Sequence, residues 1–178
     1  MQINWASACA IPLASEQRPQ HTKDQAHAGV IAPPPLIFAI CLLVGYLAHR
    51  TLAGPSLGLA DLSIREPLAI GLAIIGLGFA LIAFVQFRKA GTPAEPWKAT
   101  EAFVASGIYR FTRNPMYLGM AICFVAAALW LNAAFVLIAL VPALVIMEWG
   151  VIRREEKYLE AKFGEPYRAY KRAVRRWI

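Results

Sequence analysis

One run of the sequence is Leu68-Ala-Ile-Gly-Leu-Ala-Ile-Ile-Gly-Leu-Gly-Phe-Ala-Leu-Ile-Ala-Phe-Val-Gln-Phe87, which has no charge and, in Gln86, only one strongly polar residue. As an α-helix this run would extend about 30 Å, which matches the thickness of the hydrocarbon core of a bilayer. An uncharged apolar run of this length is typical of a transmembrane helix. We therefore expect an integral membrane protein whose chain crosses the bilayer at residues 68–87.

The sequence contains three more apolar runs, Leu36–Leu52, Met116–Leu131 and Ala133–Met147. The last two are joined at Asn132, and each needs its flanking residues to complete a crossing. Hydrophobic residues make up 58% of the 178 residues and charged residues only 16%, well below the roughly 25% of soluble proteins. We predict an all-α membrane protein with about four transmembrane helices, of which the last two form a helical hairpin. A re-entrant pair is the alternative for these two.

The basic residues predict the orientation of the chain in the membrane. Sixteen of the 18 lysines and arginines lie before the first run, between the second and third, or after the fourth, and only Arg50 and Arg65 lie on the other side. Because cytoplasmic loops carry the excess of basic residues, we expect both termini in the cytoplasm, at an inner or plasma membrane. The formal net charge of +7 then indicates contact with anionic lipid headgroups and does not indicate nucleic-acid binding.

The chain divides into a tail and a membrane domain. Residues 1–35 are largely polar, and we expect a mobile N-terminal tail there, followed by one domain over residues 36–178. Within this domain, residues 153–178 combine charged and apolar side chains at helical spacing, which predicts a cytoplasmic amphipathic C-terminal tail. The three cysteines and three histidines show no spacing of metal ligands, so we predict no metal site.

Polar and aromatic residues gather where the third helix is expected to start, in the segment Gly107-Ile-Tyr-Arg-Phe-Thr-Arg-Asn-Pro-Met-Tyr-Leu-Gly119. Asn114 and Pro115 suit an ordinary helix start, since asparagine caps free N–H groups and proline fits the first turn. Arg110 and Arg113 are either common basic residues at a cytoplasmic helix end or part of a site for a carboxylate or phosphate, because helix N-termini attract anions.

Three acids lie where the fourth helix is expected to leave the bilayer. Glu155 and Glu156 either pair with neighbouring basic residues on the surface or reach back towards the third helix. Glu148 lies about one turn from the interface, and it is either a buried functional charge or a group in the headgroup region.

The second helix contains Gly76-Leu-Gly78. No strand precedes these glycines and no third glycine follows, so they are not a dinucleotide-binding fingerprint. They either allow close packing of another helix or leave room for a flat cofactor group, and packing is the interpretation that the sequence alone favours.

Together these features resemble the integral-membrane methyltransferases, which include isoprenylcysteine carboxyl methyltransferases and phospholipid N-methyltransferases. The resemblance extends roughly from Leu68 to Ile178 and rests on segment 107–119, the adjacent acids at 155 and 156, and residues between Phe163 and Arg176. It implies S-adenosylmethionine as methyl donor at the cytoplasmic face, and a lipid-like or isoprenylcysteine-type acceptor from the bilayer. The oligomeric state and the site of methylation (nitrogen, oxygen or sulfur) stay open.

The resemblance also implies a set of site residues. Those that would bind the donor are Gly76, Gly78, Tyr109, Arg113, Asn114, Pro115, Tyr117, Leu118, Glu155 and Glu156, and those that would take part in catalysis are Glu156 and Arg113. Asn114 replaces the histidine of the family, which leaves only hydrogen bonding there, and Arg175 stands where many members have proline. A sulfonium cation favours carboxylates and aromatic faces in its surroundings.

Two other functions compete with this interpretation. Membrane sterol reductases resemble the same region and would use NADPH, but they carry many more membrane helices than this chain predicts. A non-catalytic membrane scaffold is the second alternative. Among methyltransferase acceptors, prenylcysteine, phosphatidylethanolamine-type lipids and small hydrophobic metabolites all fit. An amine acceptor would need a base, for which Glu148 or Glu156 is the candidate.

Overall fold

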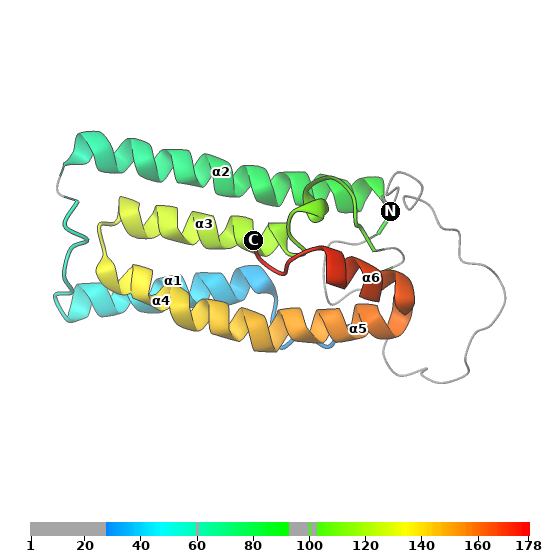
Figure 1. Ribbon diagram of the computed structural model, residues 1–178. Helices are drawn as coiled ribbons and strands as arrows, with labels where there is room; N and C mark the ends of the chain where they lie inside the picture. The colour runs from blue at the N-terminus through cyan, green and yellow to red at the C-terminus, as the bar shows by residue number, and fades with distance from the viewer. Residues whose placement is uncertain (1–27, 60, 93–99, 101–102) are drawn as a thin grey trace.

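The protein is a bundle of helices that lie side by side (Figure 1). The computed structural model describes residues 28–59, 61–92, 100 and 103–178, and no strand occurs among them. The elements are α1 (Pro34–Thr51), α2 (Leu62–Lys89), the 3-10 helix η2 (Gly107–Arg110), α3 (Pro115–Trp130), α4 (Ala134–Ile146), the π-helical segment η3 (Met147–Ile152), α5 (Arg153–Phe163) and α6 (Glu165–Ala173). The all-α fold predicted from the sequence is confirmed.

The structure has three described helices that are long and apolar enough to cross a membrane, Pro34–Thr51, Leu62–Lys89 and Ala134–Phe163, and α3 is a shorter apolar helix. This confirms a membrane protein with three to four spanning helices. The predicted hairpin joins α3 to α4 at Asn132, whose φ of 49° lies in the left-handed region that asparagine tolerates better than most residues. Its side-chain oxygen accepts a hydrogen bond from the backbone N–H of Leu57 (3.1 Å), which ties the turn to the α1–α2 connection.

The boundaries of two predicted segments shift. The α2 helix starts at Leu62, ahead of the apolar run, because the Asp61 carboxylate caps it by accepting a hydrogen bond from the backbone N–H of Ser63 (2.9 Å). Most of the tail predicted to be mobile lies outside the described residues. Its last part is held in place: the carbonyl of Gly29 accepts a hydrogen bond from Arg154 (3.0 Å), and α1 already begins at Pro34.

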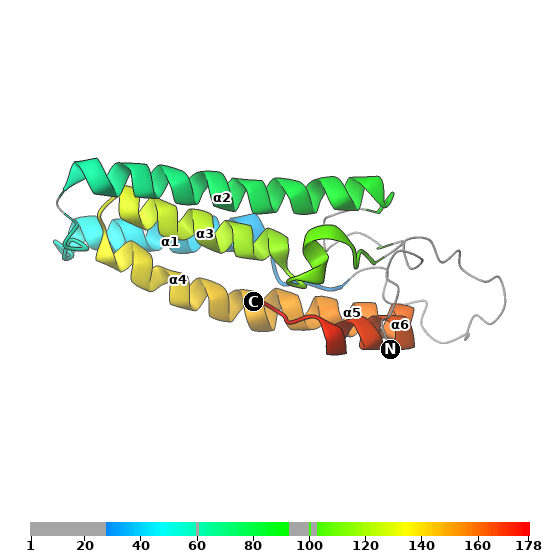
Figure 2. The ribbon, with the colours of Figure 1, turned by 45° about the horizontal axis from the view of Figure 1, so that its top comes forward.

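The fourth membrane helix continues beyond the point where the surface tail is expected to begin. Segment 153–163 is helical as predicted, but it extends α4 through η3 without a break, since Arg153 keeps helical angles (φ −64°, ψ −34°). The chain reverses only at Gly164, whose φ of 60° is accessible to glycine. The α6 helix then lies back against α5 at one end of the bundle (Figure 2).

Glycines set the closest helix contacts. A Cβ atom placed on Gly76 of α2 would lie 2.7 Å from the carbonyl oxygen of Gly119 in α3, and one on Gly45 would lie 2.8 Å from Cβ of Ala139. These distances leave no room for a side chain, so the packing interpretation of Gly76 is confirmed. A Cβ on Gly78 would meet nothing within 4 Å, so this glycine takes no part in the contact.

The distribution of apolar residues is that of a protein surrounded by lipid. A small core of fully buried residues, including Val136, Met147 and Ile152, joins α1, α3, α4 and η3. Large apolar side chains also cover the outside of α2, where Ile74 is 65% and Leu77 63% exposed. A continuous apolar surface of this kind is rare on soluble monomers and typical of contact with acyl chains.

Candidate functional site

A cavity lies at the end of the bundle where η2, the start of α3, α5 and α6 meet. It is open to solvent at its mouth and has about 650 Å³ of empty space when that open solvent is counted. The residues that line it are Phe87, Thr100, Phe103, Val104, Tyr109, Arg113, Asn114, Met116, Tyr117, Glu155, Leu159, Tyr167 and Tyr170. The fold therefore joins segment 107–119 to the acids after the fourth helix.

The polar residue of the apolar run in α2 has a structural role at this cavity. The amide of Gln86 fits with its nitrogen donating to the Ser106 carbonyl (2.9 Å) and its oxygen accepting from the N–H of Ile108 (3.2 Å). These bonds attach η2 to the end of α2. The ring of Tyr109 in η2 then packs edge-on against Phe87, with ring centroids 5.4 Å apart. Tyr109 is held in the cavity wall as a result.

The capping role predicted for Asn114 is wrong, because its side chain caps no N–H group of α3. The Nδ2 group of Asn114 instead donates a hydrogen bond to the backbone carbonyl of Arg176 (2.9 Å). Pro115 does occupy the first turn of α3, as expected. The helix start is therefore held by a distant segment rather than by its own cap.

Glu155 projects into the cavity from α5. The hydroxyl of Tyr117 donates a hydrogen bond to its Oε2 atom (2.9 Å), so this carboxylate does reach the third helix. Among the described residues, no ion pair joins Glu155 to a basic side chain. The cavity thus contains a carboxylate that has one neutral hydrogen-bond partner and aromatic surroundings, a combination that attracts cations.

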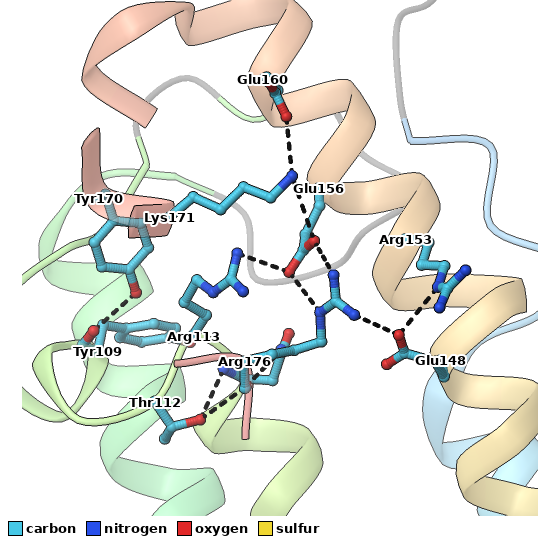
Figure 3. Close-up of polar contacts among 11 residues, drawn as sticks. Tyr109, Thr112, Arg113, Glu148, Arg153, Glu156, Glu160, Tyr170, Lys171 and Arg176 are labelled. Atoms are coloured by element: carbon cyan, nitrogen blue, oxygen red, sulfur yellow. Dashed lines mark hydrogen bonds and ion pairs between the residues drawn. The ribbon is translucent and has the colours of Figure 1, made fainter. Parts of the chain in front are cut away.

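Glu156 is buried on the other side of Arg113, with 7% of its side chain exposed. Its Oε1 lies 3.0 Å from Nη1 of Arg113, and Arg176 contacts both of its oxygens, Nε to Oε1 at 3.0 Å and Nη2 to Oε2 at 2.6 Å (Figure 3). Nζ of Lys171 lies 3.9 Å away. Three basic side chains therefore compensate the charge of this one carboxylate.

Arg113 has only 10% of its side chain exposed and also lines the cavity. Its contact with Glu156 is an ion pair without the geometry of a hydrogen bond. Within the described part of the chain, its buried Nε and Nη1 atoms make no hydrogen bond. Leaving such N–H groups unsatisfied is costly, so an anionic group bound in the cavity would stabilise them.

Glu156 and its three basic partners, Arg113, Lys171 and Arg176, form an ionic cluster. Glu148 belongs to this ionic cluster and does not line the cavity. It pairs with Arg176 and, at 3.1 Å, with Nε of Arg153, as Figure 3 shows. Its side chain is 16% exposed. Of the two alternatives for Glu148, the geometry favours a largely buried and fully paired charge.

Tyrosines from α6 and η2 complete the aromatic wall. The hydroxyl of Tyr170 donates to the carbonyl of Tyr109 (2.8 Å), and the ring of Phe103 packs against Tyr167 at a centroid distance of 5.8 Å. Burial raises the pKa of Tyr109, Tyr167 and Tyr170 above its usual value. These phenols therefore stay neutral at physiological pH and present aromatic faces and hydroxyl donors.

Comparison with known proteins shows the family of the chain. The sequence pattern of the phospholipid methyltransferase family matches residues 64–166, more than half of the chain. The chain belongs to this family. An uncharacterized protein of Haemophilus influenzae is 40% identical over 63 residues, which make up 35% of this chain and 100% of that protein. No solved structure matches the chain. The phospholipid methyltransferase match starts in α2 and ends in α6, and it spans the residues that line the cavity from Phe87 to Leu159.

Within this phospholipid methyltransferase fold, the site residues predicted from the sequence separate into three groups. Those that line the cavity are Tyr109, Arg113, Asn114, Tyr117 and Glu155. Glu156 lies behind Arg113, in the ionic cluster. Those that do not line the cavity are Gly76, Gly78, Pro115 and Leu118. The contribution of Arg176 was missed: it lies in the segment on which the family resemblance rests, but no role in the site was predicted for it.

Proposed function

We propose that this protein is an S-adenosylmethionine-dependent methyltransferase that acts on a lipid-like acceptor at the cytoplasmic face of the membrane. One observation carries the proposal: among the described residues, the cavity contains both the carboxylate of Glu155, which has no ion pair, and the guanidinium of Arg113, whose Nε and Nη1 atoms make no hydrogen bond. S-adenosylmethionine has a sulfonium cation and a carboxylate in one molecule. Its charges complement those of the cavity.

The residues present fit this donor. Glu155 and the rings of Tyr109 and Tyr117 would surround the sulfonium, and Arg113 would bind the carboxylate. When bound, the donor supplies an activated methyl group that an acceptor takes up by in-line displacement. Orientation and proximity supply much of the rate enhancement in such a reaction, so the main task of these side chains is to hold and align the reactants.

The geometry suggests different roles for the two adjacent acids. Glu156 was expected to be catalytic, but its contacts with Arg113 and Arg176 leave it poorly suited to accept a proton. Glu148 is paired in the same way. We therefore assign Glu155 as the group that would accept a proton from an amine acceptor, while Glu156 positions Arg113.

The family favours a phospholipid amine as the acceptor. Such a lipid would reach the cavity from the bilayer that surrounds α2 and the outer face of the bundle. A prenylcysteine carboxylate or a small hydrophobic metabolite would use the same donor site, but the carboxylate would need no base. A direct methyl-transfer assay with each of these three acceptor classes would therefore show which acceptor the protein prefers.

The proposal is tested by calorimetric binding of S-adenosylmethionine to the purified protein in lipid nanodiscs, with NADPH in parallel. We expect saturable binding of S-adenosylmethionine alone, followed by transfer of its labelled methyl group to a phospholipid amine. Binding of NADPH alone would instead indicate a reductase, and binding of neither by a folded sample would indicate a scaffold. As a control, the variant Glu165→Gln should bind S-adenosylmethionine as the wild type does, since this exposed acid pairs only with Arg168 and Arg172 among the described residues.

We also propose that the end of the bundle with the cavity faces the cytoplasm. This end carries α5 and α6 and most of the basic residues of the chain, in agreement with the positive-inside rule. A reporter fused after α6 should be active only as a cytoplasmic reporter. Activity of an external reporter at that position would reverse the orientation.

A further inference from the structure

The segment that follows α6, Val174–Ile178, runs back across the bundle to the start of α3 (Figure 1). We call it the return segment. Its Trp177 packs against the buried core, whereas Ile178 is 81% exposed. Only Val174 continues the hydrogen bonding of α6, to the carbonyl of Tyr170 (3.0 Å), so the rest of the segment needs other contacts to hold a fixed position.

Three hydrogen bonds fasten the return segment to the residues just before α3. The backbone N–H of Arg113 donates to the carbonyl of Arg175 (3.0 Å). The carbonyl of Arg176 accepts two more bonds, one from the hydroxyl of Thr112 (3.1 Å) and one from Nδ2 of Asn114 (2.9 Å). Thr112 is 2% and Asn114 8% exposed, so both donors are buried. The backbone of Arg176 is thereby fixed beside Arg113.

The side chain of Arg176 starts from this fixed backbone and enters the ionic cluster (Figure 3). Its Nε and Nη2 atoms contact the two oxygens of Glu156 in a bidentate pair, and Nη1 contacts Glu148. Arg113 contacts the same Oε1 atom of Glu156 from the other side (3.0 Å). Arg176 itself does not line the cavity. Its effect on a ligand must therefore pass through Glu156 and Arg113.

We propose that Arg176 is a positioning residue for the anionic end of the methyl donor, and that Asn114 and Thr112 act by holding it in place. This inference rests on the proposed function. A bidentate pair fixes the plane of the Glu156 carboxylate, and that carboxylate in turn fixes the guanidinium of Arg113. Without Arg176, the carboxylate of Glu156 loses the bidentate pair that fixes its plane, and the position of Arg113 in the cavity wall is less well fixed.

A ligand pair separates this role from a merely structural one. S-adenosylmethionine has the carboxylate that Arg113 would bind, whereas decarboxylated S-adenosylmethionine keeps the sulfonium and the adenosine but lacks it. A residue that acts through Arg113 on the carboxylate affects only the first ligand. A residue that merely holds the fold affects both equally.

The test measures the dissociation constants of both ligands for the wild type, Arg176→Gln and Arg172→Gln in nanodiscs. Arg172 is a matched control because it is 65% exposed and pairs with Glu165 alone among the described residues. We expect Arg176→Gln to weaken binding of S-adenosylmethionine about tenfold, the size of a lost charge-assisted contact. Binding of the decarboxylated ligand should change by less than about twofold, and Arg172→Gln should change neither.

Two further variants keep the test decisive if Arg176→Gln folds poorly. Arg176→Lys keeps the charge but loses the bidentate geometry, and it should show the same selective loss. Thr112→Val keeps the shape of the side chain but removes the hydroxyl that donates to the Arg176 carbonyl, and residue 112 does not line the cavity. It should show the selective loss together with faster hydrogen exchange at the amide of Arg113.

Equal weakening of both ligands in these variants would overturn the inference and leave Arg176 with a structural role only. Unchanged binding of both ligands would also overturn it. If the wild type itself binds neither ligand, the proposed function fails, and the two failures are thereby distinguished.

Discussion

The two faces of α5 give adjacent acids opposite surroundings. Glu155 faces the aromatic cavity, where Tyr117 is its hydrogen-bond partner, whereas Glu156 faces Arg113 and Arg176 in the ionic cluster. Successive residues of an α-helix differ by about 100° in direction, so one step along the chain changes the environment completely. The comparison shows that a pair of acids in a sequence need not act as a pair: one can serve a ligand while the other holds the site together.

The cost of burial explains why the difference matters. A buried carboxylate without a cation is unfavourable, whereas one with several cations in contact can be accommodated. Glu156 is in the second situation. Among the described residues no cation contacts Glu155, so it is in the first situation, which is expected where a cationic ligand completes the site.

The largest expected effect comes from Glu156→Gln, which removes the carboxylate from the ionic cluster. The buried Arg113 and the partly exposed Arg176 would become neighbouring cations without the carboxylate between them, and breaking a buried pair such as that of Arg113 and Glu156 costs about 3–5 kcal/mol. We expect the melting temperature in nanodiscs to fall by roughly 10 °C. The double variant with Arg176→Gln should recover part of this loss, because it also removes one cation. An unchanged melting temperature would show that the cluster does not stabilise the fold.

The next effect is that of Glu155→Gln, which tests the cavity face of α5. The neutral amide keeps the shape but removes the charge opposite the sulfonium, so the rate of methyl transfer should fall about 100-fold. The melting temperature should stay within about 2 °C of the wild type. Tyr117→Phe removes the hydroxyl that donates to Glu155 and should lower the rate only about tenfold. A large loss of stability in Glu155→Gln would mean that both faces of α5 have the same structural role.

Arg113 lines the cavity that Glu155 faces and also contacts Glu156, so it links the surroundings of the two acids. We expect Arg113→Ala to weaken donor binding about 30-fold, which is the size of effect expected when a hydrogen-bonded charge is lost. The stability of the fold should be affected less than donor binding, because Glu156 keeps Arg176 and Lys171 as partners. Arg110→Ala is the control: Arg110 is exposed in η2 and does not line the cavity. Calorimetry on both variants checks the prediction. Equal weakening by both would indicate that general positive charge attracts the donor, rather than a specific contact of Arg113.

The sequence predicted the membrane helices well because length and apolar composition alone determine whether a helix can span a bilayer. It also predicted that segment 107–119 and the acids after the fourth helix lie together, through the resemblance to a family. It did not distinguish Glu155 from Glu156, because their directions depend on the exact course of the helix. The π-helical segment η3 lies just before them and alters that course.

The role of Asn114 was beyond local sequence patterns for a different reason. Asparagine before a helix normally caps it, and only the tertiary structure shows the Arg176 carbonyl as its partner. The departure at Arg175, where many family members have proline, has a simple structural consequence. Its carbonyl makes the contact with Arg113 while its side chain is exposed, so this contact does not depend on the identity of residue 175.

The smallest effect concerns the two glycines of α2, which extend the comparison of adjacent faces to a second helix. A Cβ atom on Gly76 would lie 2.6 Å from Sγ of Cys123 and 2.7 Å from the carbonyl of Gly119, so Gly76→Ala must push α2 and α3 apart. Overpacking of this kind costs about 1–3 kcal/mol. Gly78→Ala meets nothing within 4 Å and should be neutral or stabilise the helix by about 0.5 kcal/mol.

Thermal unfolding of the two glycine variants, together with their affinity for S-adenosylmethionine, decides between packing and cofactor binding. If both glycines serve packing or lipid contact only, Gly76→Ala lowers the melting temperature and Gly78→Ala does not, and each folded variant binds the donor as the wild type does. A folded Gly78→Ala variant that loses donor binding would show that the cofactor extends along α2, beyond the cavity. Gly76 and Gly78 lie on different faces of α2, and in that case each glycine would have its own role: Gly76 in helix packing and Gly78 in cofactor binding.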